Sequence, residues 1–137
     1  MSSIRIKDKA FGEQKEITIK EIINNKFNCE VEKLPPFHCF DFKDLAKNVY
    51  FEHKGRRNEY NKYPDTMIGY NKIKFIKENP NNTYFFIFGF TDGNYFIKYD
   101  EELFKTFEIK KGGRCDREKP EYKTYLYIPI NHLTKMY

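Results

Sequence analysis

Three residues near the middle of the chain have the types and spacing that phosphodiester hydrolysis requires. Glu52 and Lys54 stand one residue apart in VYFEHK, and Asp41 precedes them in FHCFDF. Hydrolysis needs a hard divalent cation, which prefers carboxylate oxygens, to polarise the phosphate and help generate hydroxide. A lysine beside two such carboxylates can assist the nucleophile or stabilise the transition state. An ordinary ion pair on an exposed strand is the competing interpretation of Glu52 and Lys54.

The two segments that bear these residues are predicted to be paired strands. FHCFDF and VYFEHK are short, aromatic and β-branched, and the connector KDLAKN has the length of a hairpin turn, so antiparallel pairing is expected. Asp41 then lies within the first strand, and Glu52 and Lys54 share one face of the second. Charged groups inside apolar strands are costly to bury without a ligand, which favours a functional site.

An amphipathic helix is predicted before these strands. In GEQKEITIKEIINNKF, apolar residues recur at four-residue spacing at Ile19, Ile23 and Phe27, and the helix is expected to end at Asn24 and Asn25. The segment CEVEK that follows alternates as a strand does.

Further elements are expected after the paired strands. GRRNEYNKYPDT indicates a loop, and Thr66 is expected to cap a helix over MIGYNKIKFIKEN that stops at Asn79 and Pro80. NTYFFIFGF predicts a central strand, and the turn at Asp92 and Gly93 predicts a hairpin with NYFIKY. DEELFKTF indicates a short helix, KKGGRCDREKPEYK a basic loop, and TYLYIPI a last strand.

This order resembles the core of the PD-(D/E)xK nuclease superfamily, across about residues 12–90. FDF followed by YFEHKGRR is most similar to small viral and phage nucleases related to archaeal Holliday-junction resolvases. The resemblance implies a restriction-endonuclease-like α/β fold, a mixed central sheet flanked by helices in the order α-β-β-β-α-β. We expect residues 1–11 to form an arm and residues 12–137 a single domain. The chain departs from the pattern because no proline precedes Asp41, and Pro64-Asp65 follows the ExK motif in the wrong order.

The resemblance also implies a function and a ligand set. The expected activity is that of a Mg²⁺- or Mn²⁺-dependent DNA endonuclease, with Asp41, Glu52 and Lys54 as catalytic residues and Asp41 and Glu52 as metal ligands. A metal-linked and catalytic carboxylate on the first helix is also implied, for which Glu16 fits best and Glu13 is the alternative. The substrate is expected to be branched DNA such as a Holliday junction, cut by a homodimer.

Two other functions stay open from the sequence. A restriction- or repair-type endonuclease would use the same catalytic centre on a specified sequence or lesion. A small basic DNA-binding protein, in which the ExK triplet is accidental, is the non-enzymatic alternative.

The basic residues predict contacts with DNA. The net charge of +5 and the pI near 9.0 favour polyanionic partners. A basic and aromatic loop follows the ExK strand directly, where flanking phosphates would run, although a solvated charged loop is the competing interpretation. The candidate DNA contacts are Arg56, Arg57, Tyr60, Lys62, Tyr63, Lys72, Arg114 and Arg117.

The cysteines and the hydropathy pattern bound the protein class. Cys29, Cys39 and Cys115 are odd in number and widely spaced, so neither a disulfide framework nor a zinc site is expected. No apolar run of about 18 residues occurs, and no basic start precedes an apolar stretch. We therefore expect an intracellular protein that is neither secreted nor inserted in a membrane.

Overall fold

A computed structural model describes residues 18–114 and 121–136 of the chain. A helix is described over residues 18–27, and two more helices, a short 3-10 helix and nine strands follow within the described residues. In chain order these elements are β1 (Val31–Lys33), β2 (Phe42–Asp44), β3 (Val49–Gly55), β4 (Asp65–Gly69), α2 (Tyr70–Glu78), β5 (Thr83–Phe90), β6 (Gly93–Lys98), α3 (Glu101–Phe104), β7 (Glu108–Arg114), β8 (Glu121–Pro129), η1 (Ile130–His132) and β9 (Thr134–Lys135).

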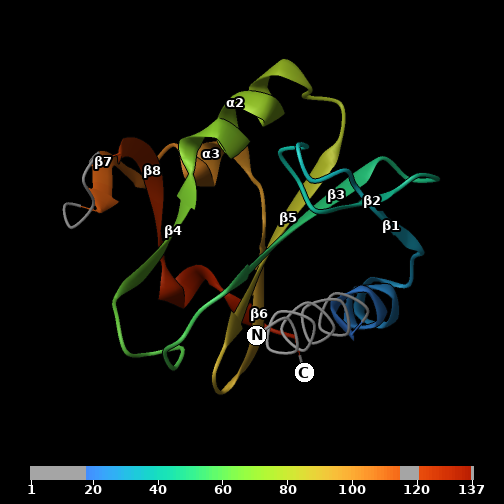
Figure 1. The fold of residues 1–137 in the computed structure, drawn as a ribbon, viewed down its shortest axis with the longest axis horizontal. Coiled ribbons are helices and arrows are strands. Elements are labelled where there is room, and N and C mark those ends of the chain that lie inside the picture. Colours follow the sequence, from blue (N-terminus) through green and yellow to red (C-terminus); the bar gives the residue numbers. More distant parts are fainter. Residues whose placement is uncertain (1–17, 115–120, 137) are drawn as a thin grey trace, which may run out of the picture.

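The larger of two sheets holds the segments predicted to form the site. Its strand order is β1-β2-β3-β5-β6-β9, and β3 and β5 are parallel while the other pairs are antiparallel. The chain crosses between these two parallel strands through β4 and α2 (Figure 1). The fold is therefore α/β with a mixed central sheet, as predicted.

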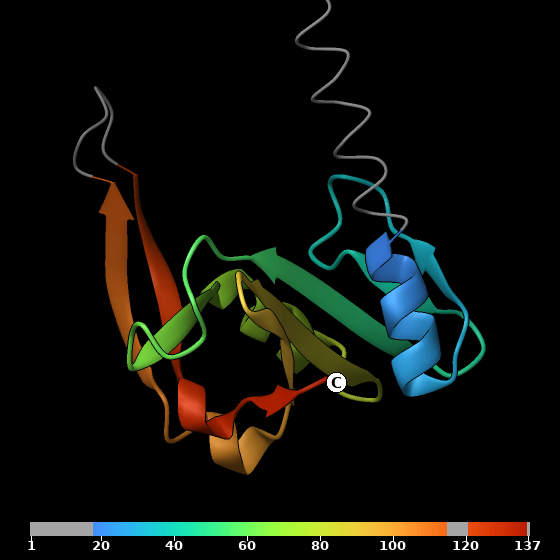
Figure 2. The same ribbon diagram turned by 90° about the horizontal axis from the view of Figure 1, so that it is seen from below.

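Two hydrophobic clusters cover the two faces of this sheet. The smaller cluster, with Ile23, Phe51 and Ile87, joins helix 18–27 to one face. The larger cluster lies between the other face and α2, α3 and the three-stranded sheet β4-β8-β7. Figure 2 shows helix 18–27 and the three-stranded sheet on opposite sides of β3 and β5.

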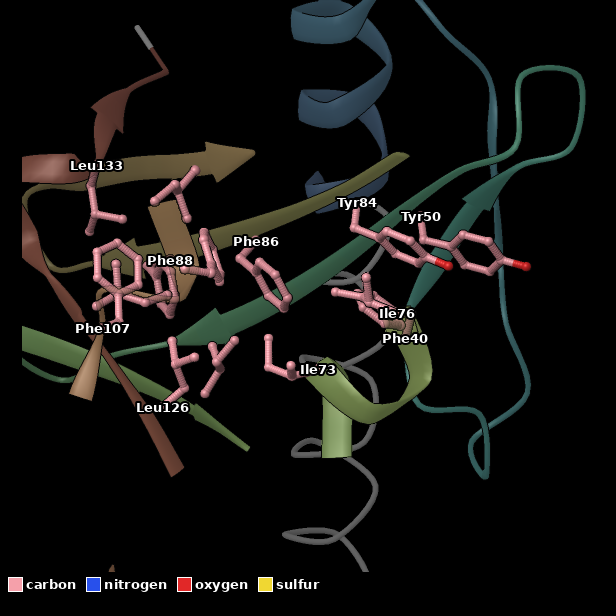
Figure 3. Close-up of a cluster of buried hydrophobic side chains, with 14 of the residues drawn as sticks. Phe40, Tyr50, Ile73, Ile76, Tyr84, Phe86, Phe88, Phe107, Leu126 and Leu133 are labelled. Carbon is pink, nitrogen blue, oxygen red and sulfur yellow. The ribbon is translucent and has the colours of Figure 1, made fainter. Parts of the chain in front are cut away.

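The uninterrupted apolar sequence of β5 follows from its burial on both faces. Phe86 and Phe88 are fully buried in the larger cluster, and Ile87 is 2% exposed in the smaller one. Figure 3 shows Phe86 and Phe88 in the larger cluster, with Ile73 reaching it from α2. The predicted central strand and its hairpin with β6 are both confirmed, but the turn lies at Thr91 and Asp92, because Gly93 already belongs to β6 and pairs with Phe90.

The end of the first helix was predicted too early. The helix continues through Asn24 and Asn25 to residue 27, and Asn28 follows with φ 50°, the left-handed conformation in which helices commonly end. Asn24 lies inside the helix and its side-chain oxygen accepts a hydrogen bond from the Val31 N–H at 2.9 Å. An asparagine pair is therefore compatible with a helix when one member ties the helix to the next strand.

The strand predicted over residues 37–42 is also wrong in its extent. Residues 37–41 form turns and bends, and β2 begins only at Phe42 and extends through Asp44. Phe37 is 90% exposed, whereas Phe40 is buried at 1%, so the segment does not alternate as a strand would. Asp41 therefore stands immediately before β2, and the antiparallel pairing of β2 with β3 is confirmed.

The second helix begins later than Thr66. Residues 65–69 form β4, in which Thr66 is buried and pairs with Ile128 of β8, and Gly69 is the N-cap of α2. Thr66 does not cap the helix because it lies within β4, before the N-cap Gly69, and its hydroxyl accepts a hydrogen bond from Arg56 Nε at 3.0 Å. The predicted stop at Asn79 is confirmed, since Asn79 is the C-cap of α2.

The basic segment KKGGR is a strand and not the loop that was predicted. Residues 108–114 form β7, which pairs antiparallel with β8, so the last predicted strand belongs to a hairpin. A Cβ atom at Gly112 would lie 3.1 Å from the Tyr127 hydroxyl and 3.3 Å from the Tyr125 ring. The glycine thus allows close approach of two tyrosines within a sheet. In the part of the chain that the structure describes, no helix has the length and apolar character needed to cross a membrane.

Candidate active site

Glu52 is a buried carboxylate in the middle of β3. Its side chain is 3% exposed, and it faces the larger hydrophobic cluster with Tyr50, which lies two residues before it on the same strand. The neighbouring residue of β5 in the register is Phe86, which is fully buried. An ionised carboxylate in such surroundings is costly unless charged or polar groups compensate it.

Two lysines supply that compensation. Lys54 Nζ lies 3.4 Å from Glu52 Oε1, and Lys72 Nζ lies 3.3 Å from Glu52 Oε2. Lys72 comes from α2, is 12% exposed in its side chain and also donates to the Cys39 carbonyl. Although Lys72 is near, Oε2 is buried and makes no hydrogen bond of normal geometry to any described residue. Each oxygen of the Glu52 carboxylate therefore faces one ammonium group.

Asp41 reaches the same region from the start of β2. Its N–H donates to the Phe51 carbonyl at 3.1 Å, while the next residue, Phe42, is the register partner of Phe51. Asp41 and Phe42 thus both lie opposite Phe51, as in a β-bulge. Such bulges change the direction of side chains and are common beside active sites. Asp41 Oδ2 accepts the His53 N–H at 2.9 Å, and Lys33 Nζ lies 3.7 Å from Oδ1.

The pKa of Glu52 is raised above its ordinary value. Burial is the main cause, and the negative charge of Asp41 is the second. Lys72 and Lys54 oppose the rise through their positive charges. The two carboxylates thus lie close enough to repel one another, which is the electrostatic setting that a bound cation relieves.

The described residues fit a hard divalent cation with two protein carboxylates. Mg²⁺ in proteins is commonly held by one or two carboxylates together with waters and substrate phosphates. Asp41 and Glu52 are two interacting carboxylates, and Glu52 Oε2 is a buried oxygen without a hydrogen bond. Within the described residues no cluster of three or more His, Cys, Asp or Glu side chains is arranged to hold a metal. Glu16 and Glu13, predicted to supply a third carboxylate, lie outside the described residues.

Two of the predicted DNA contacts, Arg56 and Tyr60, are half-buried and hydrogen-bonded within the protein. Arg56 Nε donates to Thr66 Oγ1 at 3.0 Å and its Nη2 to the Met67 carbonyl at 2.6 Å, which ties the end of β3 to β4. Burial lowers the pKa of Arg56. The Tyr60 hydroxyl donates to the Ile130 carbonyl at 2.8 Å. Both side chains therefore hold the loop in place.

The other predicted contacts fall into three groups. Arg57 and Lys62 are exposed on the loop after β3, and Tyr63 is 52% exposed beside them. Lys72 lies at the Glu52 carboxylate, as described above. Arg114 ends β7, and Arg117 lies outside the described residues.

Sequence reasoning missed Lys33 and the carbonyl of Cys39 as parts of the site. Lys33 ends β1, and its register partner Phe42 is the residue after Asp41. The position of Lys33 on the strand next to the Asp41 segment was a usable indication. Nothing in the sequence indicates that the Cys39 carbonyl accepts from Lys72.

The comparison with known protein families supports the interpretation of this geometry. A family model described as "Phage putative PDDEXK endonuclease" matches residues 7–136, which is nearly the whole chain. No curated protein matches the sequence. With an Asp before one strand and an ExK motif on the next strand of a mixed sheet, the chain belongs to the phage PDDEXK endonuclease family.

Proposed function

We propose that this protein is a divalent-metal-dependent endonuclease that hydrolyses DNA phosphodiester bonds at the site around Glu52. Asp41 and Glu52 are the proposed ligands of Mg²⁺ or Mn²⁺, with Glu16 as the candidate third carboxylate. Bound there, the cation would polarise the scissile phosphate and lower the pKa of a bound water. Branched DNA is the proposed substrate because of the resemblance to nucleases related to Holliday-junction resolvases, and a two-fold dimer, also proposed from that resemblance, would present two such sites to paired strands.

The burial of Glu52 is the observation that supports this proposal most directly. A carboxylate that is 3% exposed, with one oxygen buried and lacking a hydrogen bond of normal geometry, lowers the stability of a protein. Its presence despite that cost favours a functional role. A merely structural ion pair on an exposed strand, the alternative considered above, would have left Glu52 in solvent. The DNA-binding alternative in which the ExK triplet is accidental gives no reason for this burial.

The side chains of the site have separate proposed roles. The Lys54 side chain is 41% exposed, so its ammonium can donate to a water or to a phosphate oxygen while its position is held by Glu52. Lys72 is nearly buried, and its ammonium favours the ionised form of Glu52. Asp41 is oriented by the His53 N–H on Oδ2, and its Oδ1, which lies 3.7 Å from Lys33 Nζ, is the oxygen proposed to meet the metal.

Cleavage assays with defined DNA structures test the proposal. Labelled four-way junction, nicked duplex, intact duplex and single-stranded DNA are incubated with Mg²⁺, Mn²⁺ or EDTA. We expect metal-dependent cutting by the wild type and a loss of at least about 100-fold in Lys54→Ala, the range typical for the loss of one acid, base or transition-state contact. Symmetric cuts in the junction would support the branched-DNA substrate.

A matched control uses another strand lysine of the same sheet. Lys98 is exposed on β6, where its register partner is Phe85, and Lys98→Ala should leave cutting unchanged. Cutting by the wild type that is equal with EDTA, or that survives in Lys54→Ala, would contradict the proposal. DNA binding without cutting in either metal would favour the non-enzymatic alternative.

A further inference from the structure

A pocket lies beyond Lys54 along the same strand. It has a volume of about 330 Å³, and its lining includes Arg56, Tyr63, Asp65, Met67 and Tyr127. Its size is at the lower end of the roughly 300–1,000 Å³ range of ligand pockets. The pocket thus opens between the end of β3 and the outer side of the three-stranded sheet.

The pocket has a defined spacing from the candidate active site. Side chains two apart on a strand share a face, so Glu52 and Lys54 follow one another along β3, and Arg56, the first residue after the strand, lines the pocket. One such repeat covers about 7 Å, and a stacked DNA strand advances ~3.4 Å per nucleotide. A nucleotide one or two positions from a phosphate at Lys54 would therefore reach the pocket.

The walls of the pocket are apolar and partly exposed. Tyr63 is 52% exposed and Met67 is 40% exposed, and both line the pocket together with Tyr127. Large apolar side chains that are exposed together around a concavity are typical of a ligand-binding site. Tyrosine rings are suitable surfaces for the stacking of a nucleobase.

The charges around the pocket fit a base inside and phosphates outside. Lys62 Nζ stands 5.7 Å from the centre of the Tyr63 ring, and Lys110 Nζ stands 4.6 Å from the centre of the Tyr127 ring. Cations therefore flank two of the walls. Within the lining, Asp65 would repel a phosphate, whereas its carboxylate can accept hydrogen bonds from the amino and imino groups of a base.

We propose that this pocket binds one unpaired nucleobase of the DNA, next to the phosphate that is cut. This inference rests on the proposed function for its position relative to the scissile bond. It narrows the substrate class to DNA with an unpaired or extruded base beside the cleavage site. The base would stack on Tyr63, while Lys62 and Lys110 would contact the neighbouring phosphates.

The absence of tryptophan from the chain makes a direct test simple. The sequence contains no Trp, so Tyr63→Trp introduces a single indole at the pocket wall. The probe DNAs are a duplex, the same duplex with one bulged nucleotide, and the same bulge with an abasic sugar. All titrations are made in EDTA, so that binding is measured without cutting. We expect the bulged base to quench the indole fluorescence and the abasic bulge to leave it unchanged.

Affinity measurements provide the second readout. Stacking of one base should make the bulged DNA bind at least about fivefold more tightly than the abasic bulge. Tyr63→Ala should abolish that preference for the bulged base over the abasic bulge. Leu45→Trp is the matched control, because Leu45 is also exposed, at 66%, but lies in the turn before β3, at the opposite end of the strand from the pocket.

Three results of the binding experiments would overturn the inference. The first is equal binding of the base-bearing and abasic bulges by wild type, and the second is a preference for the bulge that survives in Tyr63→Ala. The third is an indole signal in Tyr63→Trp that follows protein concentration without DNA, which would assign the pocket to a second copy of the chain. Cleavage of DNA that proceeds without any base preference would reject the pocket alone. Base-dependent binding in EDTA, combined with no cleavage of any of the DNAs in Mg²⁺ or Mn²⁺, would reject the proposed nuclease function alone.

Discussion

Lys72 Nζ lies 3.3 Å from Glu52 Oε2, and this ion pair joins helix α2 to strand β3 beside the larger hydrophobic cluster. Both side chains are largely withdrawn from solvent, at 12% and 3% exposure. Charges that are buried together in this way depend on one another, because either one alone would be left uncompensated. The pair therefore links the candidate active site to the stability of the fold.

Replacing Lys72 should lower stability. We expect Lys72→Met to reduce the free energy of unfolding by about 2 kcal/mol, since Glu52 would lose one of its two cations in a buried position. Urea denaturation monitored by circular dichroism measures the change. Lys74→Met is the matched control, because Lys74 is exposed on the same helix, and its change should stay within about 0.5 kcal/mol.

A double-mutant cycle separates the ion pair from a general packing effect. If Lys72 acts through Glu52, Lys72→Met should cost less in a Glu52→Gln background, because the neutral amide needs no cation. An equal cost in both backgrounds would show that the two side chains are not energetically coupled.

The raised pKa of Glu52 predicts how stability depends on pH without metal. A carboxyl whose pKa is higher in the folded state binds more protons when folded, so its contribution to stability is full below its unfolded pKa, near 4.5, and is lost as the pH rises through the folded value. The unfolding free energy of the wild type minus that of Glu52→Gln should therefore fall as the pH increases from 4 upward. Urea titrations in EDTA at several pH values measure this difference. A flat or rising difference would contradict the burial of Glu52 as described.

Asp41 should matter for metal binding more than for folding. Asp41→Asn keeps an oxygen that can accept the His53 N–H but removes the charge, so we expect affinity for Mn²⁺ to fall by at least about tenfold and stability to change by less than about 1 kcal/mol. Isothermal titration calorimetry with Mn²⁺ measures the affinity. Asp92→Asn is the control, because Asp92 likewise accepts a backbone N–H at 2.9 Å, from Tyr60. Unchanged Mn²⁺ affinity in Asp41→Asn would remove Asp41 from the ligand set.

The adjacent residues Arg56 and Arg57 should respond differently to the same change. Arg56→Lys should reduce the free energy of unfolding by about 2 kcal/mol, since an ammonium cannot reproduce the bonds to Thr66 and the Met67 carbonyl. Arg57 is exposed, so Arg57→Lys should leave stability unchanged within about 0.5 kcal/mol, and Arg57→Ala should weaken DNA binding and reduce its dependence on salt. Denaturation curves and salt-dependent binding curves test the two expectations. A stability loss in Arg57→Lys that matched that of Arg56→Lys would contradict these assignments.

Local sequence patterns were enough to predict the frame of the site. The two-residue spacing of Glu52 and Lys54 puts both side chains on one face of any strand, whatever the rest of the chain does. The hairpin that brings Asp41 near Glu52 is also local, because its turn is short. The central position of β5 followed from its uninterrupted apolar sequence.

Two of the predictions that failed depended on partners far along the chain. Thr66 was expected to cap a helix, yet it is a strand residue because β8 pairs with it from far along the chain. The glycines of KKGGR suggested a loop, but pairing with β8 and the two large tyrosines made the segment a strand. Propensity is a weak prior, and cross-strand packing overrides it.

The sequence by itself thus determined the chemical groups, their shared face on β3 and the class of fold. Only the tertiary structure decided that Glu52 is buried, that Lys72 reaches it from α2 and that Arg56 is held inside by β4. The physical reason is that spacing along the chain controls only which face a side chain occupies. Burial, pKa and ion pairing depend on the elements that pack against that face, and these elements come from distant parts of the chain.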